Sequence, residues 1–116
     1  MEVPVLDRAR LEDASAGDEE FLKELVDIYV EDAEERLAEI KEALISADEE
    51  ALGRTAHQLK GSSANMGVVC VADHAKKMED LAREHAIADA AEILPSLEHE
   101  LGRARAALFE MAGTSV

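Results

Sequence analysis

His57 and Lys60 are the residues of this chain whose types and spacing best suit chemistry, and Gly61 directly follows the lysine. Residues three and four apart lie on one face of a helix, so these residues would share a stripe that also contains Ala64. An accessible imidazole keeps a free nitrogen lone pair near neutral pH and can act as a nucleophile. A lysine ammonium is a point charge suited to a phosphoryl group. The stripe therefore predicts a nucleophile beside a cation that can hold an anionic group.

The apolar spacing on both sides of this stripe indicates helices. Apolar residues, among them Phe21 and Ile28, recur at steps of three and four early in the chain, and similar patterns follow. These patterns predict helices at about 18–45, 48–65, 68–84 and 87–111. Asp18 is a suitable N-cap for the first helix, and Gly67 can adopt the left-handed conformation that ends the second. Pro95 lies inside the last pattern and predicts either a kink or a later start of that helix.

Four amphipathic segments joined by short connections predict an all-α fold, an antiparallel up-down-up-down four-helix bundle. Residues 5–13 can add a short helix across one end, and the tail 113–116 is expected to fray. A chain of 116 residues fits one compact domain, so we expect residues 1–116 to form a single domain. Because His57 follows the inward-facing Ala56 by about 100° of helical rotation, its ring should lie at the edge of the exposed surface.

The charge balance restricts the partners of the chain. With 27 acidic and 12 basic residues the net charge is −15, which argues against nucleic acid or an anionic membrane as a partner. The segment 54–83 differs, because its net charge is +2 and that of the remaining chain is −17. We see no secretory signal and no apolar run of the roughly 20 residues that span a bilayer, and Cys70 has no second cysteine with which to pair. We therefore expect a monomeric cytoplasmic protein with a buried thiol and a protein partner.

The run HQLKGSS at residues 57–63, with Gly67 four residues on, closely resembles the histidine-containing phosphotransfer (HPt) domains of multistep two-component phosphorelays. The similarity extends from about residue 6 to residue 108, and it includes the opening GDEEF of the first long helix and the Met-Glu pair that ends at Glu79. Two positions depart from the family's pattern. Val71 replaces a common leucine, and His85 stands where many members have a glycine, which leaves open how the third helix ends.

This resemblance implies a carrier of phosphoryl groups. His57 would accept the group from an aspartate on a receiver domain and pass it to another response-regulator receiver, with a hybrid histidine kinase among the partners. Lys60 would help to hold the phosphoryl group, and Glu79 would accept a hydrogen bond from the histidine ring and leave Nε2 as the nucleophile. The receiver would supply Mg²⁺, so we expect neither a cofactor nor a bound metal in this chain. It has no nucleotide-binding loop, so we expect no autokinase activity.

Several residues around the stripe allow more than one interpretation. The resemblance implies that Gly61 leaves room for a docking receiver, but Gly61 could equally relieve crowding where two helices of the bundle cross. Arg83 matches a position where some members carry a basic residue beside the histidine, and a solvated surface arginine is the alternative. The remaining candidates for docking are Arg54, Gln58, Ala64 and Lys77.

Two other functions compete with phosphotransfer. A helical bundle rich in glutamate and histidine could hold a metal through Glu-x-x-His pairs, but none of the four histidines has a glutamate three residues before it. A non-catalytic helical adaptor that binds receiver domains is the second alternative, in which His57 is incidental. Such an adaptor would usually have lost the histidine, so the presence of His57 favours phosphotransfer.

Overall fold

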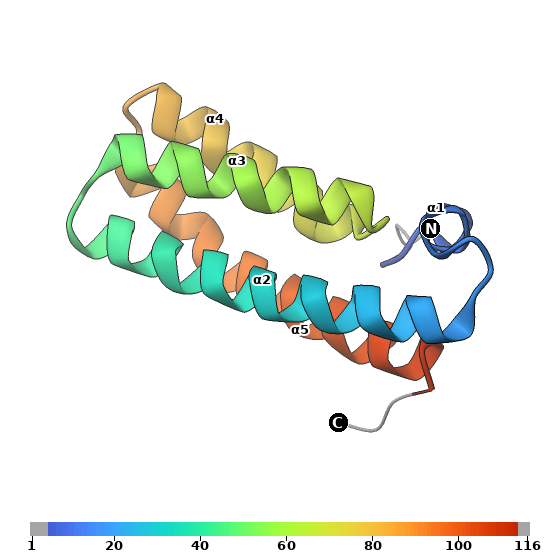
Figure 1. Ribbon diagram of the computed structural model, residues 1–116. Helices are drawn as coiled ribbons and strands as arrows, with labels where there is room; N and C mark the ends of the chain where they lie inside the picture. The colour runs from blue at the N-terminus through green and yellow to red at the C-terminus, as the bar shows by residue number, and fades with distance from the viewer. Residues whose placement is uncertain (1–4, 114–116) are drawn as a thin grey trace.

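A computed structural model describes residues 5–113, which form five helices joined by short turns (Figure 1). The helices are α1 (Arg8–Ser15), α2 (Glu19–Ile45), α3 (Glu49–Asn65), α4 (Val69–Arg83) and α5 (Ile87–Met111). Figure 1 shows α3 and α4 side by side above α2 and α5, with α1 lying across one end. The predicted all-α four-helix bundle with a short N-terminal helix is confirmed, and the predicted bounds of the four long helices agree within one residue.

Aspartate side chains cap the N-termini of three helices. Asp18 accepts hydrogen bonds from the backbone N–H groups of Glu20 and Phe21, as expected for the N-cap of α2. Asp7 and Asp48 cap α1 and α3 in the same way. A cap of this kind satisfies backbone donors that have no partner within the helix. Local sequence therefore determines where these helices start.

Gly67 follows the end of α3 and also contacts Asp7, the residue just before α1. Its φ of +70° lies in the left-handed region, as the sequence predicted. Asp7 N donates to Gly67 O at 2.7 Å, and a Cβ placed on Gly67 would lie 2.7 Å from Asp7 O. Glycine is therefore required here by both the backbone conformation and the close approach of the chain before α1.

The core contains Ala56 of α3, the residue predicted to face inward, and only part of the apolar pattern of α2. Leu52, Ala56 and Leu59 of α3 are fully buried. On α2, Phe21 is 42% exposed and Ile28 is 65% exposed, so their place in the apolar pattern was misleading. The buried stripe of α2 passes through Val26, Tyr29, Ala33 and Ile40. Tyr29, Ala33 and Ile40 belong to the predicted apolar pattern, whereas Phe21 and Ile28 lie on the side of α2 that the neighbouring helices leave exposed.

The connection between α4 and α5 corrects one expectation and answers an open question. α5 begins at Ile87 and continues through Pro95, so the later start predicted as one alternative is wrong, and the kink stays a prediction. His85 adopts the left-handed conformation, with φ of +61°, at the position where the resemblance implies a glycine. Its N–H donates to Ala82 O at 3.2 Å and closes the end of α4. Apart from Gly113, the tail predicted to fray lies outside the described residues.

Candidate functional site

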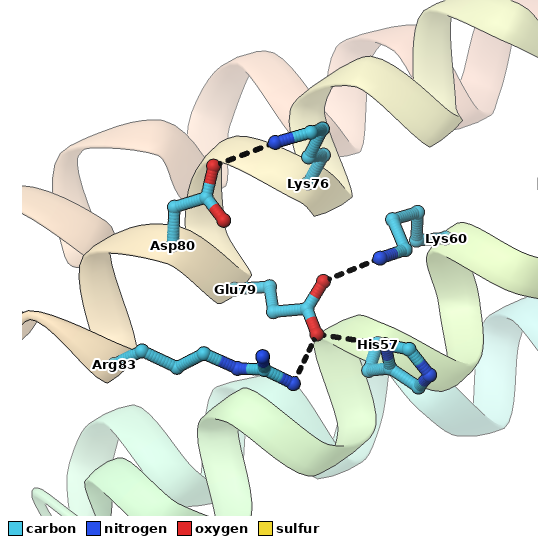
Figure 2. Close-up of polar contacts among 6 residues, drawn as sticks. All are labelled: His57, Lys60, Lys76, Glu79, Asp80 and Arg83. Atoms are coloured by element: carbon cyan, nitrogen blue, oxygen red, sulfur yellow. Dashed lines mark hydrogen bonds and ion pairs between the residues drawn. The ribbon is translucent and has the colours of Figure 1, made fainter.

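A buried carboxylate occupies the centre of the candidate site, between α3 and α4 (Figure 2). Glu79 is 2% exposed, and its two oxygens accept hydrogen bonds from three side chains. Oε2 accepts from His57 Nδ1 and from Arg83 Nη2, each at 2.7 Å, and Oε1 accepts from Lys60 Nζ at 2.7 Å. A buried charge is tolerated when its hydrogen-bonding capacity is filled by charged and polar donors. The site is therefore built around Glu79.

These bonds keep Glu79 ionised. Burial raises its pKa, but hydrogen bonds from Lys60 and His57, together with their charges, outweigh burial and lower the pKa below its usual value. An ionised carboxylate can only accept hydrogen bonds, so Nδ1 of His57 must carry the proton that it donates. The other ring nitrogen, Nε2, then holds the free lone pair.

His57 presents this second nitrogen to the outside. Its side chain is 59% exposed, in agreement with the position expected at the edge of the surface. Figure 2 shows the ring anchored on one side by Glu79 and its other nitrogen on the far side. A fixed tautomer and an accessible lone pair are the requirements for a histidine that attacks an external electrophile.

Lys60 lies one turn after His57 and reaches the same carboxylate. Its side chain is 30% exposed, and its ammonium is bonded to Glu79 Oε1. The predicted contact of Lys60 with a phosphoryl group stays a prediction. A partly exposed lysine is free to change its partner, because its stem has several rotatable bonds.

Arg83 is part of the site because it donates a hydrogen bond to Glu79. The side chain of Arg83 is 67% exposed, as expected of a surface arginine, and its Nη2 also pairs with Glu79 Oε2 at 2.7 Å. The two residues are four apart on α4, and this spacing places them on one face of the helix. That spacing was visible in the sequence and could have identified the pair.

Gly61 does not lie at a helix crossing. A Cβ on Gly61 would meet nothing within 4 Å, so the interpretation that it relieves crowding inside the bundle is wrong. Gly53 is the glycine of α3 that faces α4, and a Cβ there would lie 3.7 Å from Ala82 Cβ, an ordinary van der Waals distance. Sequence reasoning did not identify Gly53, because the partner helix of a glycine cannot be read from its own segment.

A groove of about 550 Å³ runs along α3 and α4 beside the histidine. Gly53 and Ala82 line it together with His57, Gln58, Arg54 and Arg83. Ala64 and Lys77, the other docking candidates, are exposed on α3 and α4 and do not line this groove. The predicted docking residues are therefore distributed over the groove and the surface around it.

Gln58 is held by a residue that sequence reasoning missed. Arg36, on α2, donates from Nη1 to Gln58 Oε1 at 3.0 Å. Its side chain is 20% exposed and also pairs with Asp32 and Glu39. The two bonded residues are 22 positions apart, so no local spacing could have joined them. Gln58 is consequently positioned by α2 as well as by its own helix.

No group of three or more His, Cys, Asp or Glu among residues 5–113 is arranged to hold a metal ion. Over the same residues, no helix is both long enough and apolar enough to cross a membrane.

Comparison with known proteins gives a consistent result. The sequence pattern of the Hpt domain matches residues 24–107. The phosphorelay intermediate protein rdeA of Dictyostelium discoideum is 30% identical over 95 residues, which are 82% of this chain but 37% of that protein. The crystal structure of histidine-containing phosphotransfer protein B (HptB) from Pseudomonas aeruginosa PAO1 is similar with a TM-score of 0.89 and 34% identity, over 97% of both chains. The chain thus spans little more than a third of rdeA and nearly all of the HptB structure.

Proposed function

The chain belongs to the Hpt domain family, the histidine phosphotransfer domains of two-component phosphorelays, and we propose that His57 carries the phosphoryl group. In this proposal, His57 accepts the group from an aspartate on one receiver domain and passes it to a second receiver. The observation that carries the proposal is the bond between His57 Nδ1 and Glu79 Oε2 at 2.7 Å on a side chain that is 59% exposed.

The proposed step is an in-line displacement at phosphorus. The lone pair of His57 Nε2 forms the new N–P bond, and the P–O bond to the receiver aspartate breaks and leaves a free carboxylate. Because Nδ1 keeps its proton, the phosphorylated ring is a cation. Glu79 accepts the hydrogen bond from that cation, so its negative charge stabilises the product more than the neutral ring. Return of the group to a second receiver is the same step in reverse.

In this proposal the chain works as a carrier, and its partner provides the remaining chemistry. The receiver supplies Mg²⁺ and the phosphoryl donor, and we propose no autokinase activity for this chain. Lys60 stabilises the charge on the phosphoryl group. The docking surface includes Gly61, which leaves space for a partner's backbone or side chain, with Arg54, Gln58, Ala64 and Lys77 around it. A hybrid histidine kinase as partner, the monomeric state and the cytoplasmic location stay predictions.

Transfer of label from a phosphorylated receiver tests this function. Wild-type protein should take up the radioactive phosphoryl group, and a His57→Gln variant should not. A His74→Gln variant is the matched control, because His74 lies on α4 and donates from Nδ1 to Cys70 O at 2.8 Å, away from Glu79. Label retained by the His57→Gln protein would exclude His57 as the carrier.

The same experiment, with binding to the receiver measured as well, distinguishes a phosphoryl carrier from a non-catalytic adaptor. A carrier takes label and binds the receiver, and its His57→Gln variant still binds while taking no label. A wild-type protein that binds the receiver but takes no label would support the adaptor instead.

A further inference from the structure

The two cations that pair with Glu79 hold different oxygens and come from different helices (Figure 2). Lys60 belongs to α3, like His57, and donates to Oε1. Arg83 belongs to α4, like Glu79, and donates to Oε2, the oxygen that also accepts from His57 Nδ1. The buried carboxylate is therefore compensated twice, and the two compensating charges are not equivalent.

Phosphorylation of His57 would give Lys60 a second negatively charged group with which to pair. A phosphoryl group on His57 Nε2 brings close to two negative charges to the face of α3 that also carries Lys60, three residues on. The Lys60 side chain is partly exposed and can turn outward. Glu79 would stay where it is, since it is 2% exposed. A buried charge that loses its compensating partner is strongly destabilising. Movement of Lys60 towards the phosphoryl group therefore requires a second cation that stays on Glu79.

Arg83 meets this requirement. It lies one turn after Glu79 on the same helix, with the glutamate on the N-terminal side, which is the favourable order for such a pair. The pair therefore does not depend on movement between α3 and α4. Because Arg83 donates to Oε2, it also holds the oxygen to which His57 is bonded.

We infer that Arg83 is a positioning residue of the transfer reaction, an inference that rests on the proposed function. Arg83 stays on Glu79 Oε2 while Lys60 exchanges Oε1 for the phosphoryl group. In doing so it keeps Oε2 directed at His57 Nδ1, so that the proton stays on Nδ1 and Nε2 stays free.

The test compares Arg83→Gln with Lys76→Gln and with the conservative change Arg83→Lys. Lys76 forms a similar pair on α4, four residues from its partner, with its ammonium 2.9 Å from Asp80 Oδ2 (Figure 2). Its removal therefore takes an exposed cation from the same helix and leaves the bonds to Glu79 in place. Two quantities are measured: the single-turnover rate of transfer from a phosphorylated receiver, and the tautomer of the His57 ring by nitrogen-15 NMR of the unphosphorylated protein.

The Arg83→Gln change should lower the transfer rate roughly tenfold, by analogy with the loss of groups that orient metal-bound histidines. It should also reduce the fraction of His57 rings that carry the proton on Nδ1. Arg83→Lys should restore much of both quantities, and Lys76→Gln should match the wild type. Circular dichroism checks that the helices are intact in each variant.

Three outcomes would overturn the inference, and each would contradict a different part of it. An Arg83→Gln protein that equals Lys76→Gln in rate and tautomer would remove the role of Arg83 and leave the proposed function standing. A lower rate with an unchanged tautomer would mean that Arg83 acts directly on the phosphoryl group or the receiver. A wild-type protein that takes no label would remove the proposed function, and the inference with it.

Discussion

His57 Nδ1 and Glu79 Oε2 lie 2.7 Å apart across the α3–α4 interface, although 22 residues separate them in the chain. Glu79 is nearly inaccessible to solvent and His57 is mostly accessible, so one bond joins a fixed, buried acceptor to an exposed ring. The geometry of the ring is therefore determined by the core, while its reactive nitrogen stays at the surface. Four predictions follow from this arrangement and from the helices that position it.

The charge of Glu79 should matter more than its capacity to accept a hydrogen bond from His57. A Glu79→Gln protein keeps an acceptor but loses the charge that stabilises the phosphorylated ring, and Glu79→Ala loses both. We expect the single-turnover transfer rate to fall in the order wild type, Glu79→Gln, Glu79→Ala, with a total loss of roughly 10- to 100-fold. Equal rates for the alanine variant and the wild type would show that the ring needs no partner on Nδ1.

Acid should remove the stability that Glu79 contributes. Its pKa is lower in the folded protein than the usual 4.5, because the bonds and charges of Lys60 and His57 outweigh burial. A carboxyl of this kind stabilises the fold above its unfolded pKa and loses that effect as the pH falls through the folded value. The difference in unfolding free energy between wild type and Glu79→Gln should therefore shrink as the pH falls below about 4.5. Urea unfolding across this range measures it, and a difference that grows in acid would contradict the assignment.

Gly61 should matter for transfer and not for folding. A side chain at Gly61 has open space around it, and the same is true of Gly102 on α5, which is the matched control. Replacing either glycine by glutamine should stabilise the helix by up to about 1 kcal/mol, because glycine is a poor helix former. Only Gly61→Gln should slow transfer, since the added side chain occupies the surface beside His57. If both variants transfer at the wild-type rate, Gly61 does not lie in the docking surface.

Gly67 should be the glycine whose replacement costs the most stability. Gly17 and Gly67 both have left-handed backbone, with φ of +73° and +70°, but only Gly67 has a neighbour, Asp7 O, at 2.7 Å from an added Cβ. Gly17→Ala should cost about 1–2 kcal/mol for its conformation alone, and Gly67→Ala should cost more because the chain before α1 must also move. Thermal unfolding of the two variants compares these costs. A smaller loss for Gly67→Ala would mean that α1 contributes little to the fold.

The sequence was sufficient for the features that depend on neighbours along the chain. Asp18 predicted the start of α2, and Gly67 predicted the end of the α3 segment, because caps act within one turn of the backbone. The stripe that contains His57, Lys60 and Gly61 was visible for the same reason, since a helix places residues three and four apart on one face. Even the exposure of His57 followed from its rotation relative to Ala56.

Only the tertiary structure decided which faces meet. It joined Arg36 to Gln58, and it brought Lys60 of α3 to Glu79 of α4, the carboxylate that Arg83 contacts within its own helix. It turned Gly53 towards Ala82 of α4 and Gly61 towards open space, and it left Ile28 exposed although its spacing was apolar. The physical reason is that helical periodicity defines the faces of a single helix, whereas contacts between helices depend on how the whole set packs. Thus the sequence identified the reactive histidine, and the packing of α3 against α4 determined the charges that act on it.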